Sequence, residues 1–151
     1  PVIAAGGIAD GRGMAAAFLL GAEGVQMGTR FLCCEECQVH ENYKQKILAA
    51  RDIDTQVTGK RLGQPVRVLR NAFAREFAQM EYDSSRTNEE IEKFGAGALR
   101  RAAVEGDMDS GSIMSGQIAA MVHAIEPAEK IVREITEQAG RLLAEGAKWV
   151  R

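Results

Sequence analysis

The sequence predicts an α/β fold, on the strength of three observations near its N-terminal end. Val2–Ala5 is a short apolar run that ends at two glycines. A helix is expected over 11–20, with Asp10 as its N-cap, and residues 25–27 are expected to form a second short strand that ends at Gly28. A helix that joins two neighbouring strands makes them parallel, so the pattern predicts a βαβ unit with both glycine turns at one sheet edge. Ligands bind at that edge in α/β proteins.

The rest of the chain is expected to alternate helices with polar loops. A strand is expected over 54–59, and 63–69 is expected to be a turn that leads into a second extended piece. Helices are expected over 41–48, 71–82, 89–94, 98–104 and 118–122. The stretch 83–88 is polar and predicts an exposed linker. From Pro127 an amphipathic helix is expected, because apolar residues recur every three or four positions. Its apolar positions are Ile131, Val132, Ile135, Ala139, Leu142, Leu143, Gly146, Trp149 and Val150.

Composition excludes several classes of partner. The 151 residues are 46% hydrophobic, enough for one ordinary core, and no apolar run is long enough to span a membrane. Nineteen Lys and Arg against 21 Asp and Glu give a net charge of -2 with both signs interleaved, so neither a nucleic-acid nor a membrane surface is expected. Three clustered cysteines do not make a disulfide framework and fit the cytoplasm. A buried-type strand begins directly after Pro1, with no preceding segment to cover its edge, so we expect the chain to be a fragment.

The two glycine turns predict a phosphate site. Gly6, Gly7 and Gly28 expose backbone N–H groups at neighbouring strand ends, helix N-termini add partial positive charge, and Thr29 adds a hydroxyl donor. The alternative is that these glycines only make tight turns. For Arg30 two roles stay open, an ion pair with the phosphate or packing on the outside of the fold.

Two other segments contain residues that could bind a metal or a ligand or take part in catalysis. Cys34, Cys37 and His40 recur every third residue, but a structural zinc site needs four ligands, so core or helix-surface cysteines are the favoured interpretation. A cysteine nucleophile has no identifiable base, and no pair of residues stands out as general acid and base. Ser110–Gln117 either presents donors to a planar heteroaromatic ligand, with Met114 against its face, or is an N-cap and turn.

Several segments resemble one known family. AAGGIADG and GAEGVQMGTRF open the chain, and HENYKQKIL, ARDIDT, FGAGALRRAAVEGD and GSIMSGQIAAMV follow. Together they resemble the C-terminal half of the FMN-dependent enoyl-acyl carrier protein reductases of the FabK type, and more loosely the nitronate monooxygenases. The first two motifs are shared by many phosphate-binding barrels. The later segments favour the reductase.

The resemblance implies a fold and a set of cofactor contacts. The chain would be the C-terminal part of a TIM barrel, with strands 7 and 8 in residues 1–41. A smaller, mostly helical substrate-facing domain would occupy 42–109, and 110–151 would return to the barrel. The matching positions imply FMN contacts at Gly6, Gly7, Gln26, Met27, Gly28, Thr29, Met114, Gly116 and Gln117.

The resemblance also implies a reaction and partners. NADH or NADPH would reduce FMN, and the hydride would then pass to a trans-2-enoyl group carried by acyl carrier protein. The missing N-terminal half of the barrel would supply the catalytic histidine, which neither His40 nor His123 matches, and the complete enzyme would be a homodimer. Nitronate monooxygenase is the alternative enzyme. A non-catalytic phosphate-binding half barrel is the alternative from another class.

Overall fold

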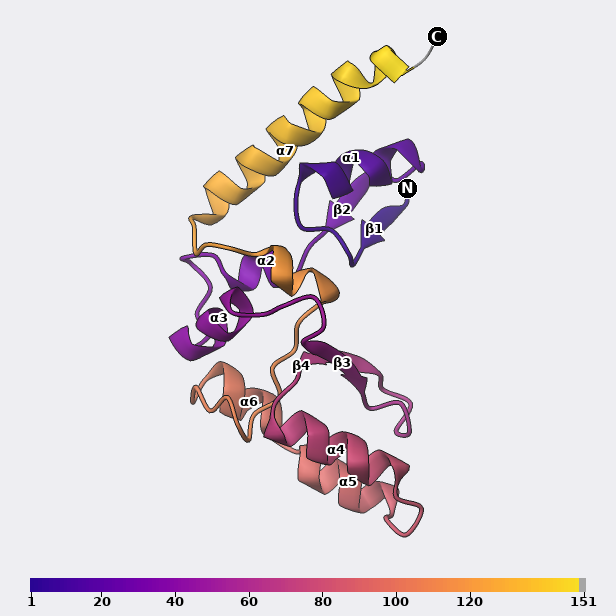
Figure 1. Ribbon diagram of the computed structural model, residues 1–151, viewed down its shortest axis with the longest axis vertical. Helices are drawn as coiled ribbons and strands as arrows, with labels where there is room; N and C mark the ends of the chain where they lie inside the picture. The colour runs from indigo at the N-terminus through magenta and orange to yellow at the C-terminus, as the bar shows by residue number, and fades with distance from the viewer. Residues whose placement is uncertain (150–151) are drawn as a thin grey trace. The chain divides into compact units, whose positions relative to one another are not determined.

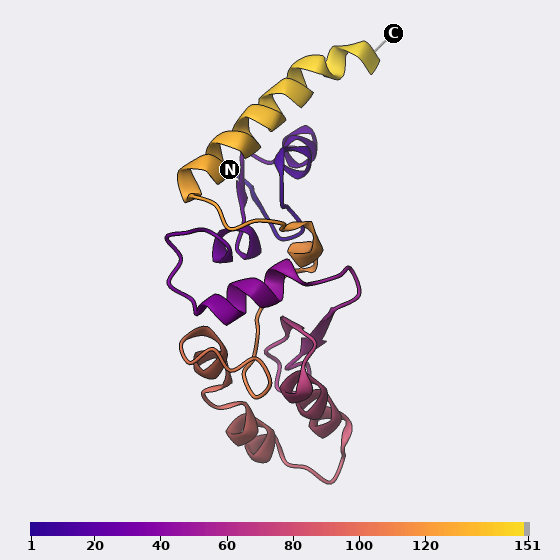
Figure 2. The ribbon, with the colours of Figure 1, turned by 60° about the vertical axis from the view of Figure 1, so that its left-hand side comes forward.

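The computed structural model describes residues 1–149 and divides the chain into two compact units. The first unit combines Pro1–Cys37 with the segment from Met121 onward, and the second unit is Gln38–Ala120. Figures 1 and 2 show the ribbon from two directions. Among the described helices, none is both long and apolar enough to cross a membrane. Val150, expected at the end of the C-terminal helix, lies outside the described residues.

The first unit contains a parallel two-stranded sheet and its connecting helix. Its elements are β1 (Ile3–Ala5), α1 (Gly11–Leu19), β2 (Gly24–Gln26), α2 (Thr29–Leu32), α7 (Ala128–Glu145) and the 3-10 helix η2 (Gly146–Trp149). Strands β1 and β2 pair in parallel, from Ile3 opposite Gly24 to Ala5 opposite Gln26. The predicted βαβ unit is therefore confirmed, and both strands end at the same edge of the sheet.

Helix α1 packs against α7, which lies beside it in both views (Figures 1 and 2). Asp10 caps α1 as predicted, because its carboxylate accepts hydrogen bonds from the N–H groups of Arg12 (2.9 Å) and Gly13 (3.2 Å). Gly11 lies at the contact, where a Cβ would come within 2.6 Å of the backbone nitrogen of Ala139. The close approach of the two helices therefore requires glycine at this position.

Helix α7 buries only part of its predicted apolar stripe. Ile131 and Ile135 are buried in a cluster with cysteine and methionine side chains of the same unit. Leu142 and Leu143 are 41% and 37% exposed, so the second half of the helix is less covered than its pattern predicts. The expected contribution of the Trp149 side chain lies outside the described part of the structure.

The second unit combines a β-hairpin with four α-helices. Its elements are α3 (Glu41–Leu48), β3 (Thr55–Thr58), β4 (Val66–Leu69), α4 (Ala72–Tyr82), α5 (Asn88–Gly95) and α6 (Ala98–Ala103), and the 3-10 helix η1 (Gln117–Met121) begins in it. Strands β3 and β4 pair antiparallel, from Thr55 opposite Leu69 to Thr58 opposite Val66. Both expected extended pieces are thus strands.

Aromatic side chains form a core cluster of the second unit. Phe73 and Phe77 are buried together with Ile91 and Ala98, and Phe94 stacks on Phe73 with ring centroids 5.1 Å apart. The helices α4 and α5 that carry most of these residues lie side by side (Figure 1). Phe73 and Phe77 are therefore core residues of this unit.

Two connecting segments refine the expectations from sequence. The stretch 83–88 is exposed, as predicted, and connects α4 to α5 within the second unit. The helix expected over 118–122 is instead η1, a 3-10 helix. The N–H of Ala119 donates to the carbonyl of Gly116 at 3.1 Å, the three-residue spacing that defines this tighter turn.

The second unit extends further along the chain than the small domain expected over 42–109. Residues 110–120 belong to it because their backbone bonds to its elements. The N–H of Ser112 donates to α6 at 2.9 Å, and the N–H of Ser115 donates to β4 at 3.0 Å. The loop that includes Met114 is thus built into the second unit.

Candidate functional site

Two glycine turns follow the parallel strands at one edge of the sheet. Gly6 and Gly7 come directly after β1 and have φ of +88° and +74°, in the left-handed region. Gly28 follows β2 and immediately precedes α2. A Cβ added to any of the three would meet no atom within 4 Å, and all three residues are exposed. The backbone of both turns is therefore open to a ligand that needs main-chain N–H groups, as a phosphate does.

The side chains around the second turn differ in what they offer a ligand. Gln26 is exposed at the end of β2. Met27 is half-buried and packs against the buried cluster of Cys34 and Ile131, so its backbone is the part more available to a ligand at the turn. Thr29, the first residue of α2, is 8% exposed. These residues fit an FMN phosphate mainly through main-chain groups.

The N-terminus of α1 is already occupied by side chains of the protein. The N–H of Gly11 donates to Oε1 of Gln138 at 2.8 Å, and the next two N–H groups bond to Asp10. Helix α2 has four residues, too few for a sizeable axial dipole. The structure therefore corrects the expectation that helix N-termini add positive charge here, because the carboxamide of Gln138 and the carboxylate of Asp10 satisfy the first donors of α1.

Arg30, whose role the sequence left open, forms an ion pair with Glu126. The two side chains are 12% and 17% exposed, and Glu126 also accepts a hydrogen bond from Lys130 at 2.7 Å. Hydrogen bonds from Lys130 and then from Arg30 hold the pKa of Glu126 below its usual range. Nη1 of Arg30 is buried without a hydrogen-bond partner in the described part of the chain. A protein carboxylate thus holds the guanidinium, which favours the packing role.

The other predicted contact residues lie in the second unit. Met114 is 36% exposed, and its carbonyl accepts a hydrogen bond from the hydroxyl of Tyr43 at 2.7 Å. Gly116 is half-buried, and Gln117 is exposed at the start of η1. The predicted contacts therefore fall into two groups, one in each unit.

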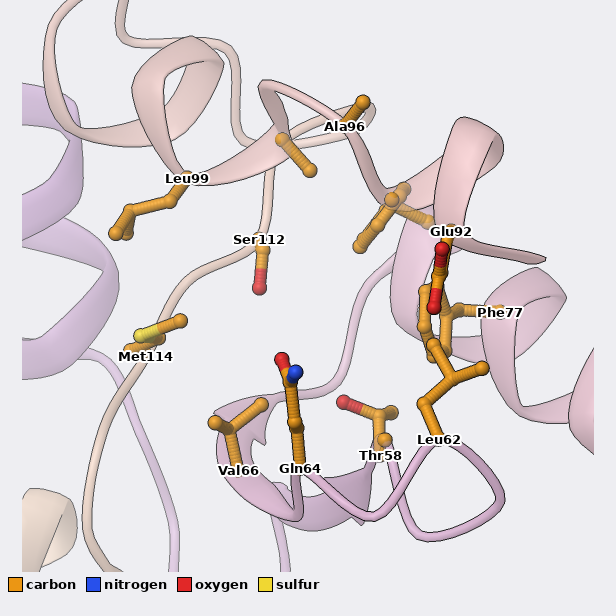
Figure 3. Close-up of a pocket in the computed structure, with 14 residues that line it drawn as sticks. Thr58, Leu62, Gln64, Val66, Phe77, Glu92, Ala96, Leu99, Ser112 and Met114 are labelled. Atoms are coloured by element: carbon orange, nitrogen blue, oxygen red, sulfur yellow. The ribbon is translucent and has the colours of Figure 1, made fainter. Parts of the chain in front are cut away.

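A cavity of about 310 Å³ lies within the second unit next to Met114 (Figure 3). Thr58, Gln64 and Ser112 turn their polar ends toward its centre. Glu92 alone is charged among the residues that line it, and this side chain is exposed. The walls are largely apolar and include Leu62, Val66, Phe73, Phe77, Leu99 and Met114. A mostly apolar cavity with a few converging neutral polar groups is typical of a site for an organic ligand.

The cysteines and His40 occupy structural positions. Cys33 and Cys34 are buried, Cys37 is half-buried, and none of the three forms a disulfide in the described part of the chain. His40 caps α3, because its Nδ1 accepts a hydrogen bond from the N–H of Asn42 at 3.1 Å. In the described part of the chain no group of three or more His, Cys, Asp or Glu side chains is arranged to hold a metal ion. The geometry gives the zinc hypothesis no support.

Comparison with known proteins gives the family. The family model for nitronate monooxygenase matches residues 1–138. The chain belongs to the nitronate monooxygenase family. Curated relatives in this family include probable nitronate monooxygenases of Staphylococcus saprophyticus and Staphylococcus aureus. Each is 38% identical over 144 residues, which is 95% of this chain and 40% of the relative. The chain thus spans about 40% of the length of these nitronate monooxygenases.

Solved structures extend the comparison. FabK from Thermotoga maritima is 49% identical with a TM-score of 0.93, and the match covers 99% of this chain and 47% of that one. A nitroalkane oxidase from Streptomyces ansochromogenes is 26% identical with a TM-score of 0.78, covering 97% and 41%. The resemblance to FabK-type proteins is confirmed, and this member of the nitronate monooxygenase family is derived from a TIM barrel.

Sequence reasoning missed several residues of these sites. Thr58 and Gln64 flank the turn of the β3–β4 hairpin and have no motif that points to a cavity. Ser112 belonged to the loop singled out as presenting donors. Glu126 is 96 residues from Arg30, so no local pattern predicts this ion pair. Its spacing of four from Lys130 on the sequence does indicate the second ion pair.

Proposed function

We propose that this chain is the C-terminal part of an FMN-dependent enoyl-acyl carrier protein reductase. The observation that carries the proposal is the 49% identity to FabK across 99% of the chain, compared with 38% for the curated nitronate monooxygenases and 26% for the nitroalkane oxidase. In this proposal β1 and β2 are the seventh and eighth barrel strands, and the second unit faces the substrate. The complete protein is a cytoplasmic homodimer.

The proposal assigns separate tasks to the residues of the two units. When bound, FMN supplies the redox chemistry by which hydride from NADH or NADPH reaches the β-carbon of a trans-2-enoyl thioester. The two glycine turns hold its phosphate through main-chain N–H groups, because no side chain fills the space beside them. The proposed phosphate contacts are Gly6, Gly7, Gln26, Met27, Gly28 and Thr29, and the proposed contacts of the flavin ring are Met114, Gly116 and Gln117.

The proposal places the catalytic acid outside this chain. His40 is used as a helix cap, and no candidate acid or base is identified among the described residues. Strand β1 pairs only with β2 in the described structure, and Val2 and Ile3 are 66% and 55% exposed. An upstream half of the barrel would cover this edge and supply the acid. The isolated 151-residue chain is therefore expected to self-associate in light scattering and to bind FMN weakly. A monomeric, fully active chain would contradict this part of the proposal.

An anaerobic assay on the complete protein that contains this chain tests the reaction. We expect a yellow protein that oxidises NADH or NADPH when crotonyl thioester is added without oxygen. Oxygen uptake with a nitronate, and no reduction of the enoyl group, would instead make the protein a nitronate monooxygenase. The matched family model and the names of the curated relatives favour that second candidate. A protein without bound flavin would support the non-catalytic half barrel.

A further inference from the structure

We propose that the cavity of the second unit binds the pantetheine arm that carries the acyl thioester, and this inference rests on the proposed reductase function. The arm is a neutral chain in which alkyl segments alternate with amides. The occupant is deduced from the chemistry of the cavity wall, its charge and its size.

The apolar part of the wall suits alkyl segments. Phe73 and Phe77 close one side and are 7% and 8% exposed, because they also belong to the core of the unit. Leu99 and Met114 line the cavity as well, yet remain 42% and 36% exposed. Large apolar side chains that stay exposed beside a cavity gain from contact with an apolar ligand.

The polar part of the wall suits an amide. Figure 3 shows the polar ends of Thr58, Gln64 and Ser112 turned toward the same space. Thr58 and Ser112 are 5% and 8% exposed, so their hydroxyls face the cavity rather than bulk water. A hydroxyl and a carboxamide can each donate and accept, which matches the N–H and C=O of an amide. A purely hydrocarbon chain would leave these groups without partners.

The charge of the cavity disfavours an anionic occupant. Among the described residues that line it, Glu92 is the one with a charge, and this carboxylate would repel a phosphate. A second cavity of the same unit, about 410 Å³, is lined by Lys46, Arg51, Arg70 and Arg75, with Asp54 paired to Arg51. Its excess of positive charge suits an anion better. The volume of about 310 Å³ holds roughly ten groups the size of a water molecule, enough for one amide with its flanking methylenes.

Conservative variants of the complete flavoprotein test the proposal. Thr58→Val and Ser112→Ala each remove one hydroxyl that faces the cavity. Thr55→Val is the control for removing a buried hydroxyl from the same strand, because Thr55 is 8% exposed, does not line the cavity and instead accepts a hydrogen bond from Arg67 at 3.0 Å. The substrates are crotonyl-pantetheine and crotonyl-ethanethiol, which lacks amides. For the pantetheine thioester we expect KM to rise about three- to ten-fold in each cavity variant with kcat unchanged, and little change for the amide-free thioester. The control variant should keep the wild-type KM for both thioesters, because the hydrogen bond that it loses lies outside the cavity.

A binding measurement separates this inference from the proposed function. Calorimetric titration with butyryl-pantetheine, which has no double bond to reduce, should show binding to the wild type that weakens by the same factor in the cavity variants. Equal effects on both crotonyl thioesters, or unchanged butyryl-pantetheine affinity, would overturn the inference. So would variants that alter only the preference between crotonyl and decenoyl chains, because the cavity would then hold the acyl tail. If no enoyl thioester is reduced by the wild type, the proposed function fails, and the titration alone decides the inference.

Discussion

Replacing Glu126 with alanine should destabilise the first unit by about 3 kcal/mol. The carboxylate is the counter-ion of Arg30, whose side chain is 12% exposed and whose Nη1 is already buried without a hydrogen-bond partner in the described structure. Removing one partner of a buried ion pair costs about 3–5 kcal/mol, because the other charge is left uncompensated. The lower end applies here, since both side chains keep some contact with water. Lys130 is 43% exposed and loses little.

Urea denaturation of the complete protein at pH 7 measures this cost. Glu129→Ala is the control, because Glu129 is 88% exposed in its ion pair with Arg133 and should change stability by less than about 0.5 kcal/mol. Combining Glu126→Ala with Arg30→Met should recover most of the loss, since no buried charge remains.

The pH dependence provides a second check on the same ion pair. Hydrogen bonds from Lys130 and then Arg30 hold the pKa of Glu126 below its ordinary value of 4.5. A carboxyl whose pKa is lower in the folded state contributes its full stability above the unfolded pKa and loses it as the pH falls through the folded pKa. The difference between wild type and Glu126→Ala should therefore be largest near neutrality and shrink below about pH 4.5. A difference under about 1 kcal/mol at pH 7, or one that does not change between pH 7 and 3, would refute the reasoning.

Three further predictions concern helix packing, a buried cap and the phosphate turns. Gly11→Ala should lower the stability measured by thermal unfolding by about 1–3 kcal/mol, because the new Cβ would lie 2.6 Å from the backbone of α7. Gly140→Ala should instead raise the stability by up to about 1 kcal/mol, because a Cβ at this helical position meets no atom within 4 Å. The opposite order would contradict the packing of α1 on α7. Asn71→Ala should lower the free energy of unfolding by about 2 kcal/mol. The buried amide group of Asn71 donates to two loop carbonyls (2.8 and 2.7 Å), and its oxygen caps α4. An unchanged melting temperature would disprove this role. Gly28→Val and Thr29→Val should weaken FMN binding in a fluorescence titration, the latter by about 1.5–3 kcal/mol, and unchanged affinity in both would remove the phosphate assignment.

Elements that depend on nearby residues could be predicted from the sequence. Asp10 was expected to cap α1 because a short acceptor side chain preceded an apolar-periodic segment, and its carboxylate does so. The expected helix over 71–82 is observed as α4, with Asn71 as its cap. The parallel pairing of β1 with β2 followed from a chain geometry that allows few alternatives. Each of these rests on interactions within one element or between consecutive elements.

Contacts between distant parts of the chain could not be predicted in this way. The N-terminus of α7 is capped by the carboxylate of Glu36, which accepts from the N–H of Ala128 at 2.9 Å across 92 residues. Gly11 was assigned only to the start of a helix, yet its lack of a side chain lets α7 approach. The cavity likewise depends on how the hairpin turn faces α5 and α6, which no local pattern determines. For this reason the proposed flavin contacts rest on resemblance, while the cavity rests on the structure.

The conflict between pattern and burial in the first unit bears on the proposed upstream half. Val2–Ala5 is an uninterrupted apolar run, which is typical of a parallel strand covered on both faces. In the described part of the chain Val2 and Ile3 are instead 66% and 55% exposed, and β1 pairs with one strand, β2. Leu19 and Leu20, at the end of α1, are 79% and 90% exposed. Burying each of these large side chains would contribute about 1.5–3 kcal/mol, so further strands and helices beside them would stabilise this unit substantially. The exposed strand thus supports a larger barrel on physical grounds independent of the length of the relatives.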